Sequence, residues 1–97
     1  ERPSLWQRPG RCIRRFHDHG VVHADLNVRN ILVDLDDRIF LIDFDRARLA
    51  PGEKDAYQRN LKRLQRSFRK LWPGTIAALM QPCWEHLVKG YEEGGSR

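Results

Sequence analysis

Residues 23–30 of the chain read HADLNVRN, and residues 39–45 read IFLIDFD. Between these two stretches an apolar run, ILV, is followed by an acidic segment, DLDDR. Two short apolar runs joined by a polar turn favour a β-hairpin. Such a hairpin would bring Asn30, just before its first strand, next to Asp43, just after its second strand.

Oxygen-bearing side chains at these positions match the needs of phosphoryl transfer. A carboxylate must orient the attacking hydroxyl and accept its proton, and oxygen ligands must hold Mg²⁺ against the nucleotide phosphates. Asp25 could meet the first need, and Asn30 and Asp43 could meet the second. The spacing therefore predicts a phosphotransfer site built from one loop and one hairpin.

The rest of the chain predicts an α+β fold that is mainly helical. Apolar residues recur at helical spacing in two places, and a proline or glycine follows each of them. The apolar strands could be buried on both faces or could form a small hairpin beneath a helix. The expected elements are an irregular start (1–10), a helix (11–19), a catalytic loop and metal-binding hairpin (21–45), a loop (45–57), a basic amphipathic helix (58–71) and two short helices (75–80 and 82–89).

Charge is distributed unevenly along the 97 residues, whose net charge is +5. Residues 56–84 hold six basic side chains and no acid, whereas residues 25–55 hold eight acids and five bases. A carboxylate-rich centre beside a basic block favours a site that handles metal and phosphate together. The basic helix could be a solvated face, could contact acidic sugars, lipid phosphates or anionic headgroups, or could bind nucleic acid.

The histidines and cysteines suggest no metal centre of their own. We expect His23 to be a structural histidine, and His17, His19 and His86 to lie at the surface or at helix ends. The two cysteines are far apart and lack C-x-x-C spacing, which argues against a disulfide or zinc framework and favours a reducing compartment.

Taken together, the motifs resemble the C-terminal lobe of the protein-kinase-like fold. Residues 23–30 match H-R-D-L-x-x-x-N except that Ala24 stands in place of the arginine. The D-F-G motif is matched only in part, because Asp45 stands where glycine is usual, and A-P-E is missing. These departures point away from eukaryotic-type protein kinases and toward the small-substrate branch.

Within that branch the sequence is similar to the 3-deoxy-D-manno-octulosonic acid (Kdo) kinases of the lipopolysaccharide kinase family. The similarity covers roughly residues 12–72, and its most selective parts are DFDRAR at residues 43–48 and NLKRLQRSFRK at residues 60–70. It implies phosphorylation of a sugar, the 4-hydroxyl of Kdo in the lipopolysaccharide inner core, with ATP and Mg²⁺. It also implies a location on the cytoplasmic face of the bacterial inner membrane, with a possible peripheral contact to anionic lipid and no nucleic acid partner.

The alternatives are another kinase-like phosphotransferase, such as a heptose kinase or a Rio-like kinase, and an inert fragment that binds anionic lipid or nucleic acid.

The resemblance implies a role for each polar residue of the motif. Asp25 would be the general base, and His23 would orient the loop. Asn30 and Asp43 would hold Mg²⁺ and through it the nucleotide, and Asn27 would lie near the transferred phosphate.

The resemblance also concerns two arginines and the elements that bind nucleotide in kinase-like enzymes. Arg46 and Arg48 could meet anionic groups of the substrate. No Gly-rich loop, strand lysine or preceding helix glutamate is found in the chain. We therefore expect a single partial domain, the C-terminal lobe without its N-terminal lobe, which alone is inactive because it does not hold ATP productively.

Overall fold

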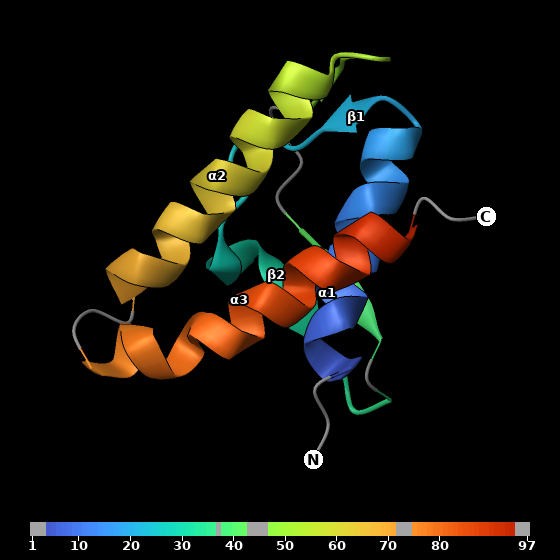
Figure 1. The fold of residues 1–97 in the computed structure, drawn as a ribbon. Helices are drawn as coiled ribbons and strands as arrows, with labels where there is room; N and C mark the ends of the chain where they lie inside the picture. The colour runs from blue at the N-terminus through green and yellow to red at the C-terminus, as the bar shows by residue number, and fades with distance from the viewer. Residues whose placement is uncertain (1–3, 37, 43–46, 72–74, 95–97) are drawn as a thin grey trace.

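The computed structural model describes residues 4–36, 38–42, 47–71 and 75–94, which form long helices and two small antiparallel sheets (Figure 1). The fold is α+β and mostly helical, as the sequence predicted. In chain order the elements are α1 (Ser4–Asp18), β1 (Val21–Val22), the 3₁₀ helix η1 (Val28–Asn30), β2 (Ile31–Val33), β3 (Ile39–Leu41), β4 (Arg48–Leu49), α2 (Lys54–Leu71) and α3 (Thr75–Gly94).

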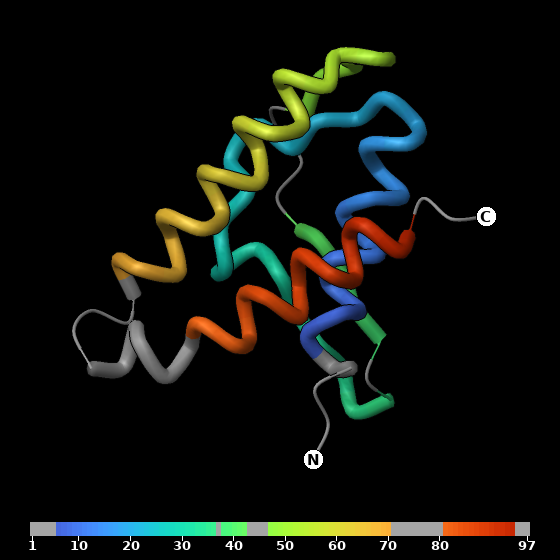
Figure 2. The backbone as a smooth tube through the Cα atoms, viewed as in Figure 1, coloured from blue at the N-terminus to red at the C-terminus, as the bar shows by residue number. Residues whose placement is uncertain are grey.

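Helices α1 and α3 cross in close contact, as the ribbon and the tube both show (Figure 1 and Figure 2). Each helix places a glycine at the crossing. A Cβ at Gly10 would overlap the carbonyl oxygen of Leu87, and a Cβ at Gly90 would overlap the carbonyl oxygen of Gln7. Because only a residue without a side chain permits so close an approach, the two glycines specify this crossing.

The first helix corrects the helix predicted over residues 11–19, because it begins at Ser4 and ends at Asp18. Proline and glycine disfavour a helix interior by roughly 3 and 1 kcal/mol relative to alanine, which is why an irregular start was expected. Pro9 and Gly10 are nevertheless buried within α1. Packing against α3 thus outweighs their low helix propensity.

The last helix also differs from the prediction, which placed two short helices over residues 75–80 and 82–89. Helix α3 is continuous through Pro82, which is exposed. A proline in a helix removes a backbone hydrogen bond, but Trp84, Leu87 and Tyr91 are all buried beyond it. Burial of these side chains holds the segment in one helix across the proline.

Helix α2 begins at Lys54, before residue 58 where the sequence predicted its start. The loop expected over residues 45–57 is also interrupted by β4, which pairs with β1. The hydroxyl of Tyr57 donates a hydrogen bond of 2.7 Å to the carbonyl oxygen of Ala50. This hydrogen bond joins the first turns of α2 to the residue after β4, and it stabilises the helix ahead of residue 58.

The hydrophobic core forms where the three helices and the loop meet. Its most deeply buried side chains are Ile13 of α1, Leu26 of the loop, Leu64 of α2 and Leu87 of α3. Phe68, one turn beyond Leu64, is buried beside them, which confirms the predicted apolar stripe of the basic helix. Because Leu26 is part of this core, packing fixes the middle of the loop.

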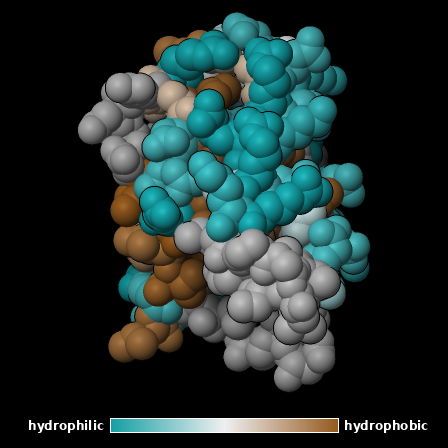
Figure 3. Space-filling view, turned by 90° about the vertical axis from the view of Figure 1, so that its left-hand side faces the viewer, coloured by the Kyte–Doolittle hydropathy of each residue, from teal (hydrophilic) through white to brown (hydrophobic). Residues whose placement is uncertain are grey.

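Strands β2 and β3 form the predicted hairpin, with Ile31 opposite Leu41. The hairpin packs against the core cluster and α1 through these two residues, so the alternative of strands buried on both faces is wrong. The opposite face exposes Leu32 and Phe40, each 47% exposed. Figure 3 shows apolar side chains gathered along one lower edge of the surface. None of the described helices is long and apolar enough to cross a membrane.

The glycine crossing makes a prediction whose sign is informative. Gly→Ala in a helix normally stabilises by roughly 0.5–1 kcal/mol, but Gly10→Ala should lower the free energy of unfolding by about 1–3 kcal/mol because the methyl group meets the backbone of α3. Urea denaturation measures this change. Lys89→Ala, an exposed substitution on α3, is the matched control and should change stability little. A stabilising Gly10→Ala substitution would contradict the close crossing.

Candidate active site

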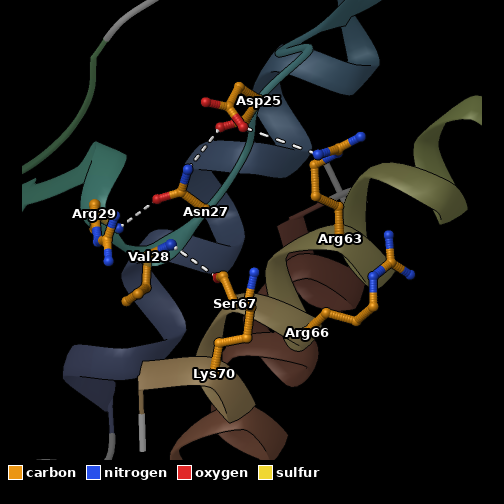
Figure 4. Close-up of a pocket in the computed structure, with 8 residues that line it drawn as sticks. All are labelled: Asp25, Asn27, Val28, Arg29, Arg63, Arg66, Ser67 and Lys70. Carbon is orange, nitrogen blue, oxygen red and sulfur yellow. Dashed lines mark hydrogen bonds and ion pairs between the residues drawn. The ribbon is translucent and has the colours of Figure 1, made fainter.

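The loop of residues 23–30 runs between β1 and β2 and passes beside α2 (Figure 4). Neighbouring side chains of the loop differ in their exposure to solvent. Leu26 is fully buried, whereas the carboxylate-bearing side chain of Asp25 is 59% exposed. The core therefore holds the loop by its apolar residue and presents its carboxylate to solvent.

His23 connects the loop to the end of the hairpin. Its Nδ1 accepts a hydrogen bond of 3.1 Å from the backbone N–H of Asp25, so its Nε2 carries the proton and donates to the carbonyl oxygen of Ile42 at 2.7 Å. The side chain is 4% exposed. His23 thus links the backbone of Asp25 to Ile42, the residue directly before Asp43.

Two asparagines hold the backbone of Asp25 from the other side. The amide groups of Asn30 and Asn27 both donate to the carbonyl oxygen of Asp25, at 2.8 Å and 3.2 Å. Asn27 also caps η1, because its Oδ1 accepts the N–H of Arg29 at 2.8 Å. The position of the Asp25 carboxylate therefore depends on hydrogen bonds made by all three polar neighbours that the sequence singled out.

The predicted metal ligands are only partly described. Asp43 lies outside the described residues, as do Asp45 and Arg46. Asn30 is 8% exposed, and within the described part of the chain its Oδ1 accepts no hydrogen bond. A carboxamide oxygen left available in this way is a suitable ligand for Mg²⁺. The backbone N–H of Ile42 bonds to the carbonyl oxygen of Asn30 at 3.0 Å, so the hairpin brings the residue before Asp43 to Asn30, as the spacing predicted.

Helix α2 anchors the loop at two points that sequence reasoning missed. The Nδ2 of Asn60 donates to the carbonyl oxygen of His23 at 2.7 Å, and the Oγ of Ser67 accepts the N–H of Val28 at 3.0 Å. Residues seven apart lie on the same face of a helix. The sequence held one signal for this contact. Asn60 and Ser67 are small, uncharged polar residues seven positions apart, in a helix whose other polar residues are mostly charged.

His17 lies in the last turn of α1, one of the two positions expected for it, but it is buried rather than exposed. It is 3% exposed; its Nδ1 accepts the hydroxyl of Tyr91 at 2.6 Å, and its Nε2 donates to the Oδ1 of Asn60 at 2.9 Å. The ring also stacks on Tyr57, with 4.6 Å between centroids. His17 of α1 thereby contacts both α2 and α3. Asn60, its partner on α2, also donates a hydrogen bond to the carbonyl oxygen of His23.

A pocket of about 370 Å³ lies between the loop and α2, and Asp25 is on its rim (Figure 4). The Nη1 atom of Arg63 is 3.9 Å from the Oδ1 of Asp25. Both side chains are more than half exposed, so this ion pair contributes at most about 1 kcal/mol. The lining residues are Asp25, Asn27, Val28, Arg29, Arg63, Arg66, Ser67 and Lys70.

Arg48 lies apart from Asp25, in a neighbouring pocket of about 360 Å³ beside Ala24. Its guanidinium group is 3.6 Å from the carboxylate of Glu53. The two pockets share Arg63 and Arg66. The structure therefore does not bring Arg48 to the same pocket as the candidate base, although a basic surface connects them.

An exposed carboxylate on a loop held by hydrogen bonds, an available amide oxygen and an adjoining basic pocket form the arrangement expected of a kinase-like phosphotransferase. The sequence model of the Lipopolysaccharide kinase (Kdo/WaaP) family matches residues 1–91. The chain belongs to this family, which confirms the resemblance seen in its motifs.

Among its relatives, the chain is 42% identical over 89 residues to a 3-deoxy-D-manno-octulosonic acid kinase of Photobacterium profundum, a match that covers 91% of the chain and 37% of the relative. It is 40% identical over 92 residues to the enzyme of the same name from Xylella fastidiosa strain 9a5c, covering 95% of the chain and 37% of the relative. The chain thus spans a little over a third of the length of these relatives.

The bonding of Asn60 predicts a large effect of its removal. Asn60→Ala would remove the two buried hydrogen bonds by which Asn60 donates to the carbonyl oxygen of His23 and accepts the ring N–H of His17. Loss of the partner of a buried polar group costs about 1–3 kcal/mol. Urea denaturation should therefore show a loss of about 2–5 kcal/mol in the free energy of unfolding. Gln65→Ala on the same helix should change it by less than about 0.5 kcal/mol. Equal effects of the two variants would refute the anchoring role of Asn60.

Burial lowers the pKa of His17, which predicts a pH dependence of stability. The unfolded chain binds a proton near the ordinary pKa of about 6.5, whereas the folded chain resists it until lower pH. The free energy of unfolding should therefore fall as pH drops below about 6.5, by up to about 1.4 kcal/mol per pH unit from this group. Denaturation at pH 7.5 and 5.5, with an NMR titration of the imidazole, measures it. A pKa of the His17 imidazole above the ordinary value of about 6.5 would contradict this prediction.

Proposed function

We propose that the complete gene product containing this chain transfers the γ-phosphoryl group of ATP to the 4-hydroxyl of Kdo in the lipopolysaccharide inner core. The observation that carries the proposal is the rigid presentation of Asp25 at a basic pocket, in a chain of a family whose members include enzymes named 3-deoxy-D-manno-octulosonic acid kinase. The substrate of such an enzyme would be membrane-bound, so we place it on the cytoplasmic face of the bacterial inner membrane.

In the proposed reaction, Asp25 orients the acceptor hydroxyl and takes its proton. The hydroxyl oxygen forms a bond to the γ-phosphorus of ATP as the bond to the bridging oxygen breaks, and ADP leaves with those electrons. His23, Asn27 and Asn30 keep the carboxylate in place through their bonds to the backbone of Asp25. Positioning of this kind supplies much of the rate of phosphoryl transfer.

Magnesium would neutralise charge on the β- and γ-phosphates when bound. We assign its ligands to the Oδ1 of Asn30 and the carboxylate of Asp43. Asn27, on the rim of the same pocket, would lie beside the transferred phosphate. The elements that cover the nucleotide in kinase-like enzymes have no counterpart in these 97 residues, and we assign them to the part of the relatives that the chain does not span.

The proposal is tested with the complete gene product, ATP, Mg²⁺ and a lipid A precursor that carries Kdo. Transfer of phosphate to Kdo should be observed, with the product position read by ³¹P–¹H NMR. Asp25→Asn should lower kcat about 10²–10⁴-fold, because the base is lost while the shape of the loop is kept. Asp36→Asn, an exposed carboxylate of the hairpin turn, is the control and should leave kcat unchanged.

Three outcomes would overturn parts of this assignment. A wild-type protein that phosphorylates a heptose but not Kdo would change the acceptor. A wild-type protein that transfers no phosphate yet binds anionic lipid would replace the enzyme with a binding module. Normal turnover by Asp25→Asn would show that Asp25 is not the base.

A further inference from the structure

One flank of helix α2 carries cations in a row beside the loop. Arg63, Arg66 and Lys70 follow one another at helical spacing and all line the pocket on whose rim Asp25 lies (Figure 4). Ser67 lies within the same row and holds the loop through its bond to the N–H of Val28. This hydrogen bond therefore fixes the distance between the row of cations and the loop.

The pocket has more positive than negative charge. Of its lining residues only Asp25 is acidic, and its ion pair with Arg63 is long at 3.9 Å. Among the described residues no carboxylate pairs with Arg66 or Lys70. Like charges held close together repel, and a bound anion would relieve this repulsion. The arrangement thus favours an anionic ligand next to the candidate base.

The position of the pocket limits which anion this can be. A hydroxyl that reaches Asp25 must belong to a molecule that also occupies the pocket, whose volume of about 370 Å³ falls in the range of small-molecule sites. Because Asp25, Arg66 and Lys70 all line this one pocket, a single sugar could carry both the negative group and the reacting hydroxyl. An octulosonic acid has a carboxylate and several hydroxyls on one sugar, whereas a neutral sugar would leave Arg66 and Lys70 without an anionic partner.

We propose that Arg66 and Lys70, assisted by Arg63, bind the carboxylate of the acceptor sugar and so select an acidic sugar over a neutral one. This inference rests on the proposed function and names the binding residues of the same site. The planar guanidinium of Arg66 can donate two parallel hydrogen bonds to a carboxylate, and the ammonium of Lys70 adds a point charge. Binding the acid group in this way would place a hydroxyl of the same ring at Asp25.

The test compares two acceptors and two kinds of variant in the complete gene product. The acceptors are a Kdo-bearing lipid A precursor and its Kdo methyl ester, which keeps the hydroxyls but removes the negative charge. The variants are Arg66→Gln and Lys70→Gln, and the control is Arg69→Gln, an exposed arginine of α2 that is not among the residues lining the pocket.

Wild-type protein should favour the free acid over the ester by at least about 10-fold in kcat/KM, since hydrogen bonds to a charged carboxylate are about twice as strong as neutral ones. Arg66→Gln and Lys70→Gln should raise the KM for the free acid, leave the KM for ATP unchanged and remove most of the preference over the ester. Arg69→Gln should behave as wild type. If the variants lower kcat/KM for acid and ester equally, the carboxylate is not bound here and the inference is overturned.

Two further measurements separate this proposal from its competitors. An acceptor whose lipid A phosphates have been removed should retain the effect of Arg66→Gln, and loss of the effect would assign the cations to a phosphate instead. Vesicles that contain phosphatidylglycerol should bind Arg66→Gln and Arg69→Gln alike, whereas a selective loss for Arg66→Gln would assign this residue to the membrane surface.

A binding measurement distinguishes failure of this inference from failure of the proposed function. Calorimetric titration of the complete gene product with free Kdo and with its methyl ester needs no phosphoryl transfer. Binding of the acid alone, weakened by Arg66→Gln but not by Arg69→Gln, would support the carboxylate site even if no transfer were seen. Active transfer with no discrimination between acid and ester would overturn the carboxylate site and leave the proposed function standing.

Discussion

The side-chain amide of Asn60 is bonded at both ends inside the protein, and the position of the loop depends on it. One end accepts the ring N–H of His17 and the other donates to the carbonyl oxygen of His23. His23 in turn holds Asp25 and the end of β3. A buried group with all partners in place is rigid, and one with a missing partner is costly. Every helix therefore contributes to where the Asp25 carboxylate points.

The sequence predicted the loop and the hairpin better than it predicted the ends of the helices around them. The loop and hairpin follow from local signals, namely two apolar runs, a polar turn and Asn30 at the strand start. The ends of α1 and α3 do not, because Pro9, Gly10 and Pro82 are poor helix formers whose cost is offset by contacts far away in the chain. Intrinsic propensity is a weak guide where tertiary packing decides.

The polar groups that sequence reasoning missed have the same origin. The sequence places His17 at the surface or at a helix end, because nothing in its neighbourhood along the chain indicates a buried partner. Its partners are Tyr91 and Asn60, 74 and 43 residues away. Asn60 and Ser67 were read as part of a basic helix, although their spacing is that of one helical face. Only the fold shows that this face meets the loop, and that the arginines beside it meet a pocket.

The crossing of α1 and α3 has a consequence for the order of folding. The glycines that permit it lie near the beginning and the end of the chain, so the contact closes a loop that contains almost all other elements. Contacts of such long sequence separation are made late and slowly. On a ribosome, Tyr91 emerges after the whole of the loop and α2 have been synthesised, so His17 waits for its partner. The series of hydrogen bonds from Tyr91 through His17 and Asn60 to His23 is therefore complete only after α3 has been synthesised.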